Sequence, residues 1–177
     1  NTIILDVRNQ DDFKDGFVPG SIFIGIKGGF APWVGSVVKD INTKILLVCE
    51  NGQETETITR LSRVGFDNVI GYLNGGFKQW KSNDEKVETI ESMSAEELEK
   101  VIKSEINLID VRACGERKNG YLGITKSIPL NKFDSEINTI NKKEKQYIHC
   151  AGGYRSMIAC SMPVSYTHLR AHETLDH

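Results

Sequence analysis

The feature that most constrains the fold of this chain is an internal repeat. The hexapeptide Ile3-Ile-Leu-Asp-Val-Arg8 recurs as Asn107-Leu-Ile-Asp-Val-Arg112. After each hexapeptide come, in the same order, an acid four residues beyond the arginine, a glycine followed by an aromatic residue, and an apolar run that ends in a cysteine. These features are Asp12, Gly16 and Cys49 in the first copy, and Glu116, Gly120 and Cys150 in the second. Because the correspondences keep their order, we predict two copies of one domain.

Along the chain, short apolar runs alternate with segments of helical spacing. The runs at 3–7, 22–26, 45–49 and 69–73 have the length and the β-branched content of buried strands. The expected helices are 53–64, 76–81, 94–104 and 155–162, the third opened by a Ser94-x-x-Glu97 capping box. This alternation predicts an α/β fold of two domains, each a mainly parallel sheet flanked by helices. In such sheets functional groups collect beyond the C-terminal strand ends, where Cys49 and Cys150 fall.

The repeat and the local composition divide the chain into four parts. Residues 1–82 form the first domain, the polar and acidic stretch 83–92 the linker, and 93–162 the second domain. The second copy has no counterpart of residues 63–80, so we expect it to be truncated, with an unpaired strand edge and low stability. The stretch 163–177 resembles a translated sequencing adapter and is left out of the fold. Because the chain starts within a strand and without methionine, we expect it to be a fragment that lacks an upstream part.

Cys150 begins a loop that is suited to hold a thiolate. Gly152 and Gly153 allow successive backbone N–H groups to point inward, and a helix starting near Tyr154 directs its positive end to the same place. Arg155 adds a fixed positive charge. The alternative, a buried core cysteine, needs neither the glycines nor the arginine. Only four residues separate Cys150 from Arg155, so the loop fits one extra sulfur atom better than a tetrahedral phosphate.

The segment Cys150-Ala-Gly-Gly-Tyr-Arg155-Ser156 resembles the active-site loop of the rhodanese sulfurtransferase family. The order of Asp-Val-Arg, acid, glycine and cysteine loop is similar to the rhodanese pattern in both copies, from Ile3 to Met162. The resemblance implies that Cys150 is the nucleophile and sulfur carrier, with Arg155 as the second catalytic residue. The residues implied to bind the transferred sulfur are Ala151, Gly152, Gly153, Tyr154 and Ser156. His149 is expected to point to the other side of the strand and is not assigned as a base.

The charged residues of the repeat are assigned a structural role. A buried strand that ends in aspartate and arginine usually needs paired charges. We expect Arg8 to pair with Asp12, and Arg112 with Glu116, as ties that shape each domain around its loop. The residues assigned to this role are Asp6, Arg8, Asp110, Arg112 and Glu116.

The first copy carries the opposite charge at its loop. Aligning Cys49 with Cys150 places Glu54 opposite Arg155, with Glu50 and Glu56 nearby. Carboxylates beside a thiol disfavour its ionised form and raise its pKa. We therefore expect the first domain to be catalytically silent and to serve packing, docking or positioning.

Two stretches of the first copy carry a further resemblance. Residues 28–35, which include Phe30 and Trp33, are either a partner-facing patch or part of the core. Together with 73–80, they are similar to the tandem rhodanese region of bacterial fusion proteins whose N-terminal domain has the metallo-β-lactamase fold of the persulfide dioxygenase type. This resemblance implies iron in a missing upstream domain. No metal and no cofactor is assigned to this chain itself, because its cysteines lack the spacing of metal ligands.

The predicted function is a sulfurtransferase step within a larger protein of sulfide or persulfide metabolism. Cys150 would carry sulfane sulfur as a persulfide from thiosulfate or a low-molecular-weight persulfide to a thiol or cyanide, so the expected partners are small sulfur compounds. Two alternatives stay open: a non-catalytic interaction module, and a cysteine-dependent phosphatase or arsenate reductase, which the short loop disfavours.

The charge and hydropathy of the chain bear on its other partners. The net charge of −2 gives no reason to expect nucleic acid or an anionic membrane. No apolar run reaches the roughly 18 residues of a membrane-spanning helix. A reduced, cytoplasmic protein is therefore expected.

Overall fold

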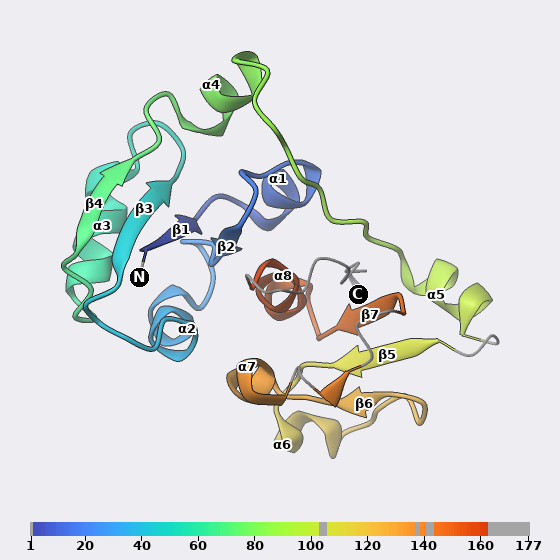
Figure 1. Cartoon of the computed structure of the whole chain (residues 1–177). Coiled ribbons are helices and arrows are strands. Elements are labelled where there is room, and N and C mark those ends of the chain that lie inside the picture. Colours follow the sequence, from blue (N-terminus) through green and yellow to red (C-terminus); the bar gives the residue numbers. More distant parts are fainter. Residues whose placement is uncertain (1, 103–105, 137–138, 141–143, 163–177) are drawn as a thin grey trace. The chain divides into compact units, whose positions relative to one another are not determined.

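The computed structural model describes residues 2–102, 106–136, 139–140 and 144–162 (Figure 1). They fall into two compact units, one containing Asn1–Thr89 and the other Ile90–Cys160. Each unit is built on its own sheet, and each is described here by itself.

The first unit contains a four-stranded parallel sheet with the strand order β2-β1-β3-β4. Its strands are β1 (Thr2–Asp6), β2 (Ser21–Phe23), β3 (Lys44–Val48) and β4 (Val69–Tyr72). Its helices are α1 (Gln10–Asp15), α2 (Phe30–Val37), α3 (Glu54–Ser62) and α4 (Gly76–Ser82). Because all four strands run in one direction, their C-terminal ends meet at one edge of the sheet.

Apolar side chains cover both faces of this sheet at β1 and β2. On one face, Leu5 of β1 packs with Val34 of α2 and Leu61 of α3, and all three side chains are fully buried. On the other face, Phe13 of α1 stacks on Phe17 with a distance of 4.3 Å between ring centroids. Burial on both faces fits the near-continuous hydrophobic runs of the inner strands. In β3 and β4 burial alternates along the strand, and Leu46, Ile70 and Tyr72 are exposed.

The second unit contains a three-stranded parallel sheet with the order β6-β5-β7. Its strands are β5 (Asn107–Asp110), β6 (Lys126–Ser127) and β7 (Gln146–His149). Its helices are α5 (Ala95–Val101), α6 (Cys114–Arg117), the 3₁₀ helix η1 (Leu130–Lys132), α7 (Phe133–Glu136) and α8 (Tyr154–Ser161). Among the described residues, β7 pairs with β5 alone, whereas the equivalent strand β3 pairs on both sides.

These elements confirm the predicted α/β fold with parallel sheets. The expected strand 22–26 is shorter than predicted and one residue earlier, and the helix expected at 53–64 covers Glu54–Ser62. The capping box of α5 is formed, because Ser94 Oγ accepts from the Glu97 N–H and the Ser94 N–H donates to Glu97 at 2.7 Å. Within residues 28–35, Phe30 belongs to the buried core and Trp33 packs against it, which favours the core interpretation of that stretch.

The predicted linker 83–92 begins as an ordered part of the first unit. Glu88 forms an antiparallel β-bridge with Phe17, and the indole N–H of Trp80 donates to the Lys86 carbonyl at 2.9 Å. The predicted domain boundaries at 82 and 93 stay predictions. The segment 163–177, interpreted as an adapter-derived tail, lies outside the described residues.

Candidate functional site

Cys150 lies between the end of β7 and the start of α8, and its side chain is buried, with 4% of its surface exposed. Its Sγ is 3.5 Å from Ser156 Oγ, and the Ser156 hydroxyl donates to the Gly153 carbonyl at 2.8 Å. A hydroxyl has one proton to donate. In this arrangement the Cys150 thiol is therefore the donor to Ser156, and the predicted hydrogen bond from Ser156 to a sulfur requires the hydroxyl to turn away from Gly153.

The loop around Cys150 is closed by local backbone geometry. Gly153 has φ +76°, a left-handed conformation that glycine adopts without steric cost. The Tyr154 N–H donates to the Gly152 carbonyl at 2.9 Å, and the Met157 N–H donates to the Gly153 carbonyl at 2.9 Å. This tight turn places the thiol at the N-terminal end of α8, where the helix dipole favours negative charge.

Arg155 is fixed beside this loop by Glu116 of α6. The two side chains form a bidentate pair, with distances of 2.5 Å and 2.8 Å between guanidinium nitrogens and carboxylate oxygens. The pKa of Arg155 is raised, chiefly by this hydrogen bond and also by the neighbouring Cys150. The hydrogen bond from Arg155 is likewise the main reason that the pKa of Glu116 is lowered. The guanidinium thus stays charged and oriented, although Glu116 offsets part of its charge.

The aspartate and arginine of each repeat bind each other. Arg8 donates to Asp6 and to the Gly16 carbonyl, both at 2.7 Å, and Arg112 donates to Asp110 at 2.8 Å. The predicted pairs Arg8–Asp12 and Arg112–Glu116 are therefore wrong. Two residues of spacing let each arginine fold back on the carboxylate that ends its own strand, and Glu116 is left to bind Arg155.

The sequence interpretation missed Arg117, which follows Glu116. Its guanidinium binds Asp110 at 2.7 Å and Thr125 Oγ1 at 3.0 Å, and lies 4.4 Å from the ring centre of Tyr121. The sequence signal that could have identified Arg117 is that it is a second arginine close to Asp110, after Arg112. Arg117 aligns with Phe13 in the first copy, and among the described residues Arg8 is the side-chain partner of Asp6.

The pKa values of the two buried aspartates shift in opposite directions. Burial tends to raise the pKa of Asp110, but hydrogen bonds from Arg112, together with nearby positive charge, hold that pKa below its ordinary value. At Asp6 burial outweighs the single Arg8 partner, and the pKa is raised. The structure therefore surrounds Asp110 with more positive charge than Asp6.

His149 lies beside Asp110 in the sheet register and is almost fully buried. Its Nε2 is 3.9 Å from Asp110 Oδ2 and has no hydrogen-bond partner among the described residues. Burial is the main reason that the pKa of His149 is lowered. The side chain faces the aspartate that ends β5.

The equivalent loop of the first unit has the opposite electrostatic character. Gly52 takes the left-handed conformation of Gly153, with φ +89°, and its N–H donates to the Glu54 carboxylate at 3.1 Å. Burial, then Glu54 and to a smaller extent Asp6 and Glu50, raise the pKa of the Cys49 thiol to about 11. The predicted direction is confirmed.

The part assigned to Glu56 in that prediction is wrong. Its carboxylate turns to Arg60 one helical turn later, at 2.7 Å. A residue at position i+4 on a helix is within reach, so α3 itself removes Glu56 from the surroundings of Cys49.

No group of histidine, cysteine, aspartate and glutamate side chains among the described residues is arranged to hold a metal ion. None of the described helices is long and apolar enough to cross a membrane.

Comparisons with known proteins give the following similarities. Residues 1–83 match the family model of the rhodanese-like domain. The adenylyltransferase and sulfurtransferase uba4 of Pyricularia oryzae is 29% identical over 97 residues, which cover 45% of this chain and 20% of that protein. The chain thus spans one fifth of the length of this curated relative.

Solved structures are also similar. A rhodanese-like domain protein of Staphylococcus aureus is 29% identical with a TM-score of 0.43, over 47% of this chain and 82% of that one. A thiosulfate sulfurtransferase of Pseudomonas aeruginosa is 17% identical with a TM-score of 0.42, over 98% of this chain and 37% of that one. The match to the family model of the rhodanese-like domain thus covers residues 1–83, just under half of this chain.

Proposed function

We propose that the second unit transfers sulfane sulfur through a persulfide on Cys150. The observation that carries this proposal is the placement of the Cys150 thiol at the start of α8, 3.5 Å from Ser156 Oγ, with Arg155 fixed beside the loop by Glu116. The family match lies in the first unit, and the internal repeat extends its pattern to the second.

The reaction balances without an external oxidant. The Cys150 thiolate attacks the terminal sulfur of a donor such as thiosulfate, a new S–S bond forms, and the donor's S–S bond breaks with its electron pair leaving on sulfite. An acceptor thiolate or cyanide then attacks the outer sulfur of the persulfide. The Cys150 thiolate is restored, and the product is a persulfide or thiocyanate.

Each loop residue has a distinct part in this scheme. The backbone N–H groups of 151–156 and the dipole of α8 stabilise the anionic sulfur. Arg155 orients an anionic donor, and the Ser156 hydroxyl turns from Gly153 to donate to the outer sulfur. Because only 4% of Cys150 is exposed, the donor must be small and must present its sulfur at one end.

The test is mass spectrometry of the full chain after incubation with thiosulfate. Wild-type protein should gain one sulfur atom on the peptide containing Cys150, and Cys150→Ser should gain none. Cys114→Ser is the matched control, because Cys114 is an exposed thiol at the start of α6, and it should load like wild type. A wild-type chain that takes up no sulfur from thiosulfate or from a low-molecular-weight persulfide would refute the proposal.

For the first unit we propose a non-catalytic role. The raised pKa of Cys49 keeps its thiol protonated near neutral pH, and the carboxylate of Glu54 stands where a persulfide would need positive charge. The alternative of a phosphatase or arsenate reductase is disfavoured by the short loop after Cys150. Turnover of an aryl phosphate that Cys150→Ser abolishes would revive it.

The cellular setting belongs to the same proposal. Small sulfur compounds are its substrates, and a reducing, cytoplasmic compartment would keep Cys150 available as a thiol. An upstream iron-containing domain of the metallo-β-lactamase fold stays a prediction.

A further inference from the structure

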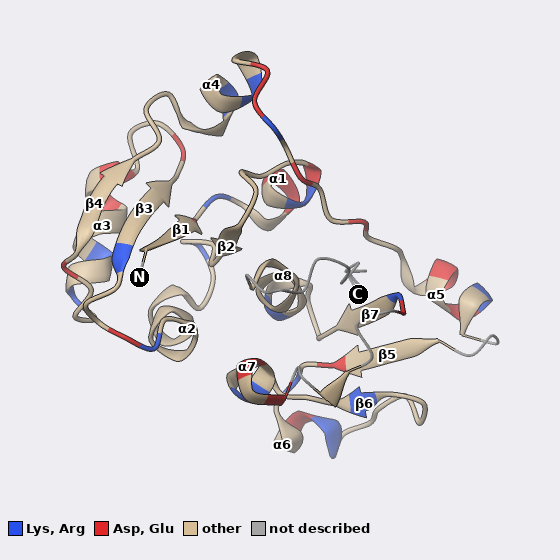
Figure 2. Ribbon diagram, in the orientation of Figure 1, with Lys and Arg blue, Asp and Glu red and all other residues tan. Residues whose placement is uncertain are grey.

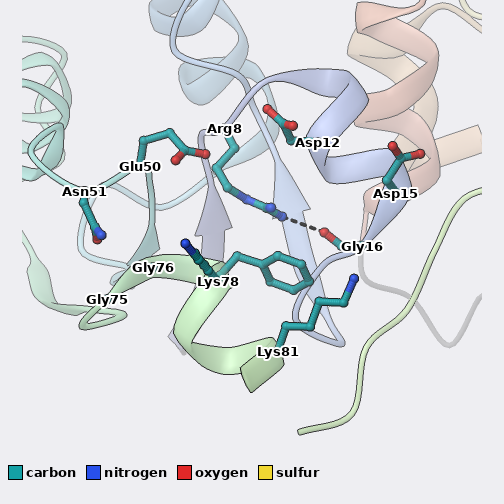
Figure 3. Close-up of a pocket in the computed structure, with 11 residues that line it drawn as sticks. Arg8, Asp12, Asp15, Gly16, Glu50, Asn51, Gly75, Gly76, Lys78 and Lys81 are labelled. Atoms are coloured by element: carbon teal, nitrogen blue, oxygen red, sulfur yellow. Dashed lines mark hydrogen bonds between the residues drawn. The ribbon is translucent and has the colours of Figure 1, made fainter. Parts of the chain in front are cut away.

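The first unit contains a pocket of about 350 Å³ at the C-terminal edge of its sheet (Figure 3). This volume is at the lower end of the range for small-molecule sites, roughly 300–1,000 Å³. Its walls come from the segment after β1, the loop after β3, helix α1, and the start of α4 with the turn before it. The charged residues that line it are Arg8, Asp12, Asp15, Glu50, Lys78 and Lys81. None of them belongs to the Cys150 loop.

Opposite charges line this pocket without neutralising each other. Asp12 and Asp15 lie on α1, Glu50 follows β3, and Lys78 and Lys81 lie on α4 (Figure 3). Figure 2 shows acidic residues on α1 and basic residues on α4. Among the described residues, none of these five side chains has an ion-pair partner within 4.0 Å. Neighbouring charges outside the pocket do pair, such as Lys14 with Asp11 at 3.6 Å. The pocket therefore holds carboxylates and ammonium groups that are free to bind a ligand.

Arg8 supplies a rigid cationic group to the same pocket. Its Nε and Nη2 are occupied by Asp6, and Nη2 also donates to the Gly16 carbonyl, as the dashed line in Figure 3 marks. Its guanidinium lies 4.2 Å from the ring centre of Phe77. Nη1 donates to no acceptor in the described part of the chain. Because Arg8 is held in place before any ligand arrives, an anion bound to Nη1 would require little ordering of the side chain.

We propose that this pocket binds a small zwitterion, an α-amino acid or a short peptide with a free ammonium and a free carboxylate. The ligand's carboxylate would bind Arg8 and the lysines of α4, and its ammonium would bind Asp12 and Asp15 of α1, on the other side of Arg8 from Glu50 (Figure 3). A ligand with one charge would leave the opposite set of groups desolvated and unpaired, which costs binding energy. The site does not depend on sulfur transfer at Cys150, and it gives the silent first unit a recognition function.

The experiment titrates the ¹⁵N-labelled full chain with three matched peptides and follows the backbone signals of Asn51, Gly75 and Gly76, which line the pocket. Triglycine carries both charges, N-acetyltriglycine only the carboxylate, and triglycine amide only the ammonium. Triglycine should shift these signals with a saturable curve. Each singly charged peptide should bind about tenfold more weakly, because charged hydrogen bonds contribute energies of that order.

Charge-neutral variants locate the binding. Lys81→Gln and Asp15→Asn should each weaken triglycine binding about tenfold. Lys27→Gln and Asp67→Asn remove the same charges from exposed positions of the first unit outside the pocket, and they should bind like wild type. Cys150→Ser should also bind like wild type, so failure of the sulfur-transfer proposal would leave this one standing.

Two results would overturn the zwitterion site. One is the absence of any shift at the pocket residues with triglycine at about 20 mM, a concentration that would reveal even millimolar affinity. The other is equal binding of triglycine and either singly charged peptide, which would mean that only one set of charges meets the ligand.

Discussion

At the scale of single residues, the charges beside two equivalent cysteines separate the two copies. Cys49 is buried near Glu54 and Glu50, and its pKa is raised to about 11. Cys150 instead has Arg155 in the next turn, fixed by Glu116. A single exchange of glutamate for arginine at the aligned position thus replaces negative with positive charge at the thiol.

The reactivity of Cys49 tests this account in the first unit. Its alkylation by iodoacetamide should keep rising from about pH 8 to pH 10 without levelling off, because the thiolate is the reactive form. In Glu54→Gln the rate at a given pH should rise by a fewfold, since the carboxylate is the second cause of the shift after burial. Glu56→Gln is the control, because Glu56 pairs with Arg60. The measurement is mass spectrometry of the peptide containing Cys49, and equal effects of the two variants would contradict the account.

The position of Arg155 is tested by Glu116→Gln. Glutamine keeps the shape of the side chain but loses the charged bidentate pair, so sulfur loading of Cys150 should slow by about tenfold. Glu99→Gln removes the same charge from an exposed position on α5 and should load at the wild-type rate. The measurement is the rate of single-turnover sulfur loading with thiosulfate. An unchanged rate in Glu116→Gln would show that sulfur transfer does not need the pairing of Glu116 with Arg155.

The sequence predicted which residues form the site better than it predicted which residues interact with one another. The cysteine loop, its glycines and the acidic environment of Cys49 follow from local spacing. The pairing of Arg155 with Glu116 joins groups 39 positions apart and depends on how α6 packs near α8. Arg117 was missed for a similar reason, because the burial of Asp110 that demands a second cation appears only once the sheet is assembled.

At the scale of elements, the strand–loop–helix segment from β7 to α8 depends on one backbone conformation. Gly153 has φ +76°, so Gly153→Ala should lower the free energy of unfolding by about 1 kcal/mol and slow sulfur loading. Gly152→Ala is the matched control, because a Cβ at Gly152 meets no atom within 4 Å and its φ is outside the left-handed region. Urea denaturation with loading assays compares the two, and equal losses would show that the turn does not require a left-handed residue.

Most elements were predictable because their signals are local. Apolar runs gave the strands, and Ser94 with Glu97 gave the start of α5. The β-bridge between Glu88 and Phe17 was not predictable from the polar composition of 83–92. That bridge uses backbone groups, which any sequence can supply, and it forms because the segment passes beside Phe17 in the folded first unit.

At the scale of the whole molecule, the two units differ in the strand pairing of their sheets. In the first, β3 is paired on both sides, whereas β7 of the second is paired only with β5 among the described residues. An edge strand leaves backbone groups without sheet partners. The second unit should therefore open at lower denaturant than the first, and hydrogen exchange can follow both sets of strands in one sample.

The pH dependence of that exchange should also separate the units through His149. Burial lowers the pKa of His149 below its ordinary 6.5, and Arg112 and Arg117 add to this effect while Asp110 opposes it. Below pH 6.5 the unfolded chain binds a proton that the folded unit does not, so the free energy of unfolding falls as the pH falls through this window. Asp110 titrates below its ordinary 3.8, outside the window.

Protection factors of β5 and β7 amides should accordingly decrease between about pH 7 and pH 5.5. Those of β1 and β3 should not decrease, because the raised pKa of Asp6 lets the folded first unit bind its proton before the unfolded chain does. His149→Gln removes the titrating group, so the decrease in β5 and β7 should disappear in that variant even if its overall stability is lower. The slope with pH, rather than the stability at one pH, is the diagnostic quantity. An unchanged slope in His149→Gln would assign the acid sensitivity of the second unit to another group.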